Sequence, residues 1–377
     1  MNNIKKRFKH LMLMVLSLVL LLSTNVNAGS NLEERFENNV SSLYIASDPV
    51  SEGYINYAKE EKMNIFMSLP DVVSDELSYL DSDENIYFGN AFVLNDINYI
   101  PILANNKVIA LLAVIETNGE YSWTLSSDFS DGLNSIAKKT SRNKPAVLYT
   151  DKGNVYANIS GDIHQLTFNP EIKSIQQDNH RMNPFVENKE IVNVYNVSNK
   201  TEVKYSRIQY STRASSSKYL TLDLKETQGD QSWCSAFAGA QILRYRGKGN
   251  IYAQYIMRYY YPNVSNTDLK DKSITNSELI KYANKKKSYP SQIDNTLSIS
   301  TVKSQINSYK PIYLGCRGNG TYKKARHALV LRGYNTNSST YSVWNPWNAK
   351  YVSMSTSSKS IAVSGGTFTW DTTIYGW

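Results

Sequence analysis

The chain has 377 residues, only two of them cysteine, and carries 41 lysines and arginines against 33 aspartates and glutamates, a formal net charge of +8. So few cysteines exclude a disulfide-rich scaffold, while the length is sufficient for two ordinary domains. The sequence contains no HExxH or CxxC pattern, no GxSxG elbow and no phosphate-binding glycine loop, so it supports neither metal chemistry nor those enzyme classes.

The first 28 residues have the three-part layout of a secretory signal peptide. Four cations between residues 5 and 9 precede a 12-residue apolar run, residues 11–22, and Val26-Asn27-Ala28 forms a small-x-small cleavage pattern. The apolar run is shorter than the roughly 20 residues that a membrane-spanning helix needs. We therefore expect residues 1–28 to be removed and the mature chain to be secreted, without membrane association after export; a retained membrane anchor is the alternative.

Charge divides the remaining chain into two regions. Residues 214–377 contain 21 basic and 8 acidic residues, a net charge of +13, whereas residues 29–213 carry a net charge of −9. Opposite net charges favour docking of the two regions in water, although they fix no geometry; chance drift combined with solubility is the alternative. The lysines at 285–287 come with no nucleic-acid-binding motif, so no nucleic-acid partner is expected.

The acidic region is predicted to be an α+β domain rich in antiparallel sheet. Residues 31–68, including Leu43 and Tyr44, place apolar side chains at helical spacing and predict two helices. Two hairpins follow: residues 106–116 and 121–126 flank an Asn-Gly turn, and residues 145–150 and 154–159 flank a second turn. Its two histidines sit in no recognisable site and are interpreted as surface or packing residues.

A serine-rich, basic stretch separates the two regions. Residues 205–219 show little apolar periodicity and predict an exposed linker, with Arg213 and Lys218 as candidate cleavage points. The basic region, residues 214–377, then opens with a predicted helix from Cys234 to Tyr245, which Asp230 or Ser232 could cap. Further helices are expected around 251–259 and 277–284, and strands follow Pro311, an order that indicates an α+β domain.

The position of Cys234 favours a reactive thiol. A helix N-terminus carries partial positive charge and free N–H groups, so a thiol placed there ionises more readily, and the thiolate is the nucleophile. A thiolate of this kind needs an imidazole, and His327 is the only histidine in the basic region. A hairpin centred near residues 336–337 would bring His327 within about 5 to 8 Å of Asn345. The alternatives are a buried cysteine that packs as a small apolar group and a satisfied core histidine.

Two further groups complete the predicted site. Gln228 lies six residues before the thiol, so its side-chain N–H and the backbone N–H of Cys234 could stabilise an oxyanion. Trp347 could cover the hydrogen bond between the imidazole and the asparagine and exclude water.

The order Gln-x5-Cys, then His, then Asn-x-Trp resembles the papain-like cysteine proteases, and most closely the staphopains, which are secreted bacterial thiol proteases made as proenzymes. The segments ETQGDQSWC, RHALVLRGY, SVWNPW and the closing IYGW are similar to staphopain segments, and the resemblance covers roughly residues 219–377. It implies a papain-like domain with a helical and an antiparallel β subdomain, Cys234 as nucleophile, His327 as base, Asn345 as orienting residue and Gln228 as oxyanion donor.

The resemblance also implies partners. Residues 29–213 would be an inhibitory propeptide. Residues 214–377 would act without a cofactor, as an endopeptidase of broad specificity on host proteins outside the cell. A small dedicated protein inhibitor is a further expected partner, and a monomer is expected. Trp347, Trp233 and Arg326 are predicted to contact substrate.

Two residues depart from the staphopain pattern. Cys316 is an additional cysteine; we expect it to be a packed side chain, and a disulfide with Cys234 is the alternative. Arg326 precedes the histidine where these enzymes usually carry a smaller residue, so it could favour acidic substrate residues on the primed side. A Cys-His acyltransferase, a cell-wall peptidase and a non-catalytic secreted module that binds anionic polymers or a partner protein remain alternative functions.

Overall fold

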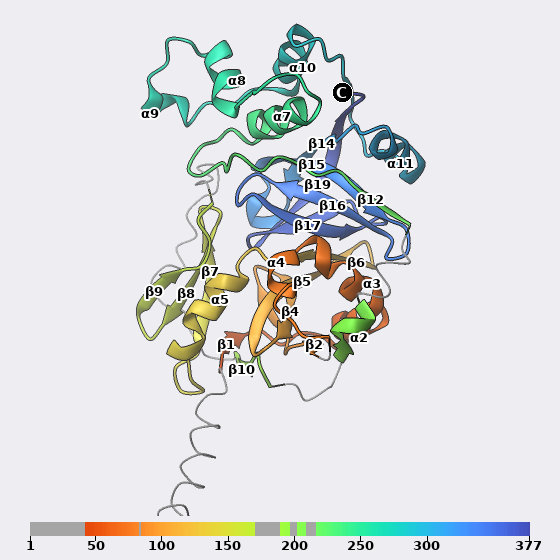
Figure 1. Cartoon of the computed structure of the whole chain (residues 1–377). Helices are drawn as coiled ribbons and strands as arrows, with labels where there is room; N and C mark the ends of the chain where they lie inside the picture. Colours follow the sequence, from red (N-terminus) through yellow and green to blue (C-terminus); the bar gives the residue numbers. More distant parts are fainter. Residues whose placement is uncertain (1–41, 83, 170–188, 197–201, 209–215) are drawn as a thin grey trace, which may run out of the picture. The chain divides into compact units, whose positions relative to one another are not determined.

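The computed structural model describes residues 42–82, 84–169, 189–196, 202–208 and 216–377 (Figure 1). The predicted signal peptide, residues 1–28, lies outside these ranges, and so does Arg213. Residues 42–377 form one contact unit. Within the described residues, no helix is long and apolar enough to cross a membrane.

The acidic region is a mixture of short helices and antiparallel strands, as expected for its α+β class. Its elements are β1 (Tyr44–Ser47), α2 (Glu52–Glu60), α3 (Lys62–Met67), α4 (Ser74–Leu77), β2 (Asn85–Phe88), β3 (Phe92–Leu94), β4 (Ile97–Ala104), β5 (Lys107–Thr117), β6 (Glu120–Ser126), α5 (Ser130–Ile136), β7 (Ala146–Asp151), β8 (Asn154–Ile159), β9 (Asp162–Gln165), β10 (Glu190–Asn193) and β11 (Glu202–Lys204).

Both predicted hairpins of this region are confirmed. Thr117 pairs with Glu120 across the turn between β5 and β6, so Asn118 and Gly119 alone form the loop, and both have positive φ, 55° and 83°. The turn between β7 and β8 has the same two-residue form, with positive φ at both central positions. A two-residue loop of this conformation has the twist that antiparallel strands require.

The helix prediction for residues 31–68 is wrong at its centre. Tyr44 begins strand β1 instead, which pairs antiparallel with β10 and parallel with β7. Ile45 on this strand and Leu43 just before it are fully buried, so pairing with two strands distant in sequence outweighs the local helical spacing. The helices α2 and α3 do lie within the later part of the predicted range.

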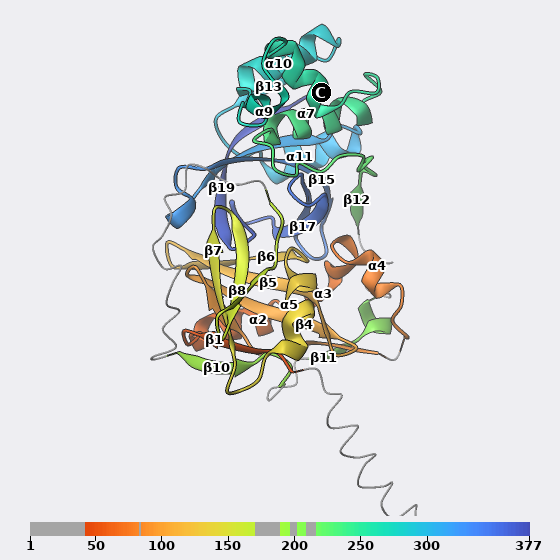
Figure 2. The ribbon, with the colours of Figure 1, turned by 90° about the vertical axis from the view of Figure 1, so that its left-hand side faces the viewer.

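The basic region begins with helices and continues with strands, which confirms its predicted α+β order. Figures 1 and 2 show α7, α8 and α10 gathered on one side of β14 and β15. The elements are β12 (Ser217–Tyr219), α7 (Cys234–Tyr245), α8 (Ala253–Tyr260), α9 (Asn266–Leu269), α10 (Asn276–Lys285), β13 (Ser291–Ile293), α11 (Ile299–Asn307), β14 (Ile312–Gly318), β15 (Arg326–Asn335), β16 (Thr340–Asn345), β17 (Lys350–Ser355), β18 (Ser360–Val363) and β19 (Gly366–Tyr375).

The linker prediction is wrong at its C-terminal end. Residues 217–219 form β12, and Lys218 pairs with Tyr334 on β15. The Lys218 ammonium also donates to the carbonyl of Asn307 over 3.0 Å and lies 3.8 Å from the centre of the Tyr309 ring. These contacts hold the backbone around Lys218 in the sheet, so it is a poor cleavage point. The predicted boundary at residues 213 and 214 lies outside the described residues.

One continuous sheet joins strands of the acidic and basic regions. Its order is β11-β2-β4-β5-β6-β17-β16-β15-β14-β19-β13. The junction is the antiparallel pair of β6 and β17, in which Ser126 lies opposite Val352 and Thr124 opposite Met354. This pairing was not predicted, because neither strand carries a local signal for a partner more than 200 residues away.

Candidate active site

Cys234 is the first residue of α7, as the sequence predicts. Trp233 occupies the N-cap position and makes no side-chain capping hydrogen bond. The predicted caps are therefore wrong, and the carboxylate of Asp230 instead contacts the Lys270 ammonium at 2.6 Å. With no side-chain cap, the first N–H groups of the helix stay available near the sulfur.

His327 and Asn345 come together on the hairpin formed by β15 and β16. Val330 pairs with Trp344 and Leu331 with Val343, the register expected for a turn near residues 336–337. The Nε2 atom of His327 lies 2.9 Å from Oδ1 of Asn345, and both side chains are buried. Within the described residues, the other ring nitrogen, Nδ1, has no hydrogen-bond partner.

Aromatic rings enclose this hydrogen bond. The indole of Trp347 stacks on the His327 ring with 4.0 Å between centroids, and its backbone N–H donates to Asn345 Oδ1 over 3.1 Å. Phe368, on β19, lies 5.5 Å from the imidazole centroid. The sequence analysis missed Phe368; its alternation with Trp370 in the segment GTFTWD was the available signal.

The sulfur of Cys234 lies beside the histidine strand. The backbone N–H of Ala328, the residue after His327, acts to lower the pKa of the thiol. Burial has the larger effect and raises that pKa above its ordinary value. Burial also lowers the pKa of His327 to about 4, although its hydrogen bond with Asn345 opposes this shift. Both groups are therefore neutral near pH 7 in this form of the chain.

Gln228 lies next to the site but its amide is occupied. Its backbone N–H donates to the carbonyl of Pro346 over 2.8 Å, which ties this loop to the residue after Asn345. Its side-chain Nε2 donates to the Gln231 carbonyl over 2.5 Å, and the side chain is 2 % exposed. An oxyanion role would require this amide to turn from Gln231 toward the substrate.

The three predicted substrate contacts differ in their surroundings. Trp233 is buried, and its indole N–H donates to the Leu269 carbonyl over 2.8 Å, so it packs inside the domain. Arg326 is exposed but forms a bidentate ion pair with Asp371, with hydrogen bonds of 2.8 and 2.9 Å. Trp347 lines a cavity of about 600 Å³, together with Gly229.

Both cysteines are free, so the structure contains no Cys234–Cys316 disulfide. Cys316 is fully buried on β14, directly opposite His327 in the strand register. The prediction of a small packed side chain is confirmed. Among the described residues, no group of three or more histidine, cysteine, aspartate or glutamate side chains is arranged to hold a metal ion.

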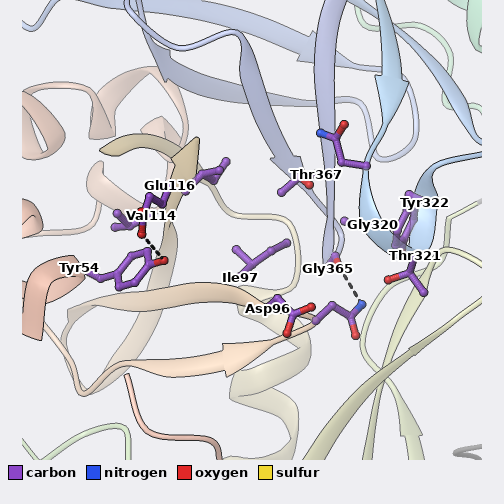
Figure 3. A pocket seen from close by; sticks show the side chains of 14 residues that line it. Tyr54, Asp96, Ile97, Val114, Glu116, Gly320, Thr321, Tyr322, Gly365 and Thr367 are labelled. Carbon is purple, nitrogen blue, oxygen red and sulfur yellow. Dashed lines mark hydrogen bonds between the residues drawn. The ribbon is translucent and has the colours of Figure 1, made fainter. Parts of the chain in front are cut away.

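A second cavity, of about 190 Å³, lies away from these residues (Figure 3). Residues of both regions line it, and Asn95 donates to the carbonyl of Gly365 over 2.9 Å at its edge. Tyr54 and Glu116 form a further hydrogen bond of 3.0 Å on its other side. Its lining includes neither cysteine nor histidine, so it offers no comparable nucleophile.

Similarity to known proteins includes the part of the chain that holds these residues. Residues 211–377 match the family described as staphopain peptidase C47. An extracellular cysteine protease of Staphylococcus epidermidis is 27 % identical over 173 residues, which are 41 % of this chain and 92 % of that protein. Staphopain A of Staphylococcus aureus is 22 % identical over 389 aligned residues, 97 % of this chain and 98 % of that protein.

These similarities confirm two predictions made from the sequence: a cysteine protease and a secreted protein. The cysteine, histidine and asparagine that the family resemblance assigned all lie within the matched residues. Residues 211–377 therefore match the staphopain peptidase family, and similarity to staphopain A extends over 97 % of the chain.

Proposed function

We propose that the chain is a secreted cysteine endopeptidase in which Cys234, His327 and Asn345 perform catalysis and Gln228 contributes to the oxyanion hole. The observation that carries this proposal is the buried His327–Asn345 hydrogen bond beneath Trp347, beside the uncapped helix N-terminus that holds Cys234. This arrangement supplies a nucleophile, a base and a residue that orients the base.

The proposed reaction has two steps. His327 takes the proton of the Cys234 thiol, the resulting thiolate attacks the peptide carbonyl carbon, and the oxyanion accepts hydrogen bonds from the Cys234 N–H and the Gln228 amide. His327 gives a proton to the leaving amine as the C–N bond breaks, which leaves a thioester on Cys234. His327 then takes a proton from water, which attacks the thioester and releases the carboxylic acid and the free thiol. Asn345 holds the imidazole in position throughout.

We further propose that residues 29–213 form an inhibitory propeptide. Several contacts between the regions support this role. The β6–β17 pair continues one sheet across both regions, and Leu166 and Phe168 line the same cavity as Trp347 and Gly229. The neutral thiol and imidazole described above are the state expected of a latent enzyme, because the reactive form is the thiolate.

Asp128 forms several hydrogen bonds across this junction. Its Oδ2 accepts hydrogen bonds from the backbone N–H and the hydroxyl of Ser364, and its Oδ1 accepts one from Asn348 over 2.5 Å. Asp131 adds an ion pair with Lys350 at 3.3 Å. These contacts join the acidic region to the loops on either side of β17 and β18.

Inhibition by the separate acidic region tests this part of the proposal. Residues 29–213, added to the mature peptidase, are expected to block it at low salt and to block it less well in about 1 M salt, where screening acts within about 3 Å. Asp128→Asn is expected to weaken inhibition by about tenfold to a hundredfold, because an amide N–H would face the groups that donate to Oδ2 or Oδ1. The measurement is the inhibition constant from initial rates of casein cleavage.

The matched control is Asp162→Asn, which removes the same charge from an exposed residue at the start of β9. It is expected to leave the inhibition constant unchanged. Absence of inhibition by the wild-type region at low salt would contradict the propeptide assignment.

A thiol-directed epoxide separates the proposed protease from the alternative functions. The mature chain is expected to cleave casein and to lose that activity in proportion to epoxide attached to Cys234, as located by mass spectrometry. A non-catalytic binding module would show neither selective labelling nor cleavage. An acyltransferase or a cell-wall peptidase would be labelled at Cys234, but would incorporate amines or release peptidoglycan fragments rather than digest casein.

A further inference from the structure

A chain of hydrogen bonds outside the cysteine, histidine and asparagine reaches the proposed nucleophile. Ser235, which follows Cys234 in α7, places its Oγ 2.9 Å from the hydroxyl of Tyr313 on β14. That tyrosine hydroxyl donates to Oδ1 of Asn276, the first residue of α10, over 3.0 Å. Three elements that are distant in sequence thus meet beside the nucleophile.

Ser235 also affects the neighbouring thiol. Its side chain and its backbone N–H both act to lower the pKa of Cys234, against the larger opposing effect of burial. A hydrogen bond to an ionised acceptor stabilises the ionised form specifically. Tyr313 is only 2 % exposed, so protein groups rather than bulk water set the orientation of its hydroxyl.

The hydroxyl hydrogens can adopt two arrangements around the same heavy atoms. With a neutral thiol, Tyr313 donates to Asn276 and Ser235 donates to Tyr313. With a thiolate, the Ser235 hydrogen turns to the sulfur, Tyr313 donates to Ser235, and the Asn276 amide rotates to present its NH₂ group to the tyrosine oxygen. No proton is transferred from one oxygen atom to another in this rearrangement. Hydrogen bonds in such a chain strengthen one another.

The other titratable groups near the sulfur supply little fixed positive charge. His327 on β15 is neutral above about pH 4. Burial raises the pKa values of Cys316 and Tyr313 on β14, so both are also neutral. Arg326, which interacts with both of these β14 groups, is already paired with Asp371. Oriented neutral dipoles are therefore a main source of stabilisation for a thiolate at this position.

We propose that Ser235 is a catalytic hydrogen-bond donor to the Cys234 thiolate, and that Tyr313 and Asn276 are positioning residues that orient its hydroxyl. This inference rests on the proposed role of Cys234 as the nucleophile. It adds a neutral donor chain on α7, β14 and α10 to the base on β15.

The pH dependence of Cys234 alkylation tests the inference. In the full-length chain with Cys316→Ala, the rate of iodoacetamide addition is measured between about pH 6 and pH 11, and mass spectrometry counts adducts at Cys234. Ser235→Ala is expected to move the profile to higher pH and to lower the rate at pH 8 by about tenfold, the effect of losing one hydrogen bond to a charged group. Ser235→Thr, which keeps the hydroxyl, is expected to restore most of the rate, and Tyr313→Phe to shift the profile in the same direction by a smaller amount.

Ser277→Ala is the matched control, because Ser277 is the second residue of α10 as Ser235 is of α7. It is expected to leave the profile unchanged. An unchanged profile in both Ser235→Ala and Tyr313→Phe would overturn the inference while leaving the nucleophile intact. Failure of iodoacetamide to modify Cys234 at any pH, both in the full-length chain and after removal of residues 29–213, would instead contradict the proposed function. If Ser235→Ala does not fold, the Tyr313→Phe profile alone tests the inference. An unshifted profile in Tyr313→Phe would then overturn the proposed chain of hydrogen bonds.

Discussion

Replacement of Cys234 by alanine is expected to reduce casein cleavage by the mature chain at least ~10⁴-fold, because removal of a covalent nucleophile leaves only binding and oxyanion stabilisation. The measurement is the initial rate of cleavage at equal protein concentration. The fold should survive, since Cys234 is only half-buried and alanine suits a helix.

The matched control is Cys316→Ala, which removes the second thiol of the chain. Cys316 is fully buried and packs inside β14, so its loss is expected to lower the melting temperature modestly and to leave the specific activity near that of the wild type. Full activity in Cys234→Ala, or complete inactivity in Cys316→Ala with the fold intact, would contradict the assignment of the nucleophile.

The second large effect concerns the full-length chain. At pH 7, iodoacetamide is expected to modify Cys234 at least ~100-fold more slowly in the full-length chain than in the mature peptidase. The expected slow reaction follows from the pKa values of Cys234 and His327. The pKa of the thiol is raised, so its thiolate accumulates only in alkaline solution, while the pKa of His327 is lowered to about 4, so its imidazolium exists only in acid. The two ranges do not overlap, and the reactive ion pair is absent between them.

Cleavage of the full-length chain should therefore raise the alkylation rate near neutral pH and extend it to lower pH. The adduct at Cys234 is quantified by mass spectrometry before and after maturation, with Cys316→Ala in both samples as the background. Equal rates in the two forms would show that the acidic region does not control the state of the thiol.

The parts of the fold governed by short-range rules could be predicted from the sequence. The Asn118-Gly119 turn fixes its hairpin because both residues adopt positive φ readily. The loop after β15 likewise fixes the register that brings His327 to Asn345. The start of α7 at Cys234 follows from uninterrupted helix-compatible residues and the glycine after its end.

The same reasoning failed where contacts between residues distant in sequence determine the structure. Residues Tyr44–Ser47 join a sheet whose other strands lie about 100 and 150 residues away, so the apolar spacing alone gave the wrong element. Asp230 has the residue type of a helix cap, but α7 begins three residues too late for it, with Trp233 at the N-cap, and Asp230 pairs with Lys270 instead. Asp128 and Tyr313 gave no sequence signal at all, because their importance arises only from the distant groups that they contact.

The junction strand β17 has a consequence for the released peptidase. If residues 29–213 are removed as proposed, β6 departs, and the backbone N–H and C=O groups that it satisfied along β17 then face solvent and can template pairing with another chain. The segment is only six residues long, carries Lys350 at one end and is rich in serine, and short, polar edges of this kind resist fibrous self-association. Solubility after activation therefore depends on the composition of a strand that takes no part in the chemistry.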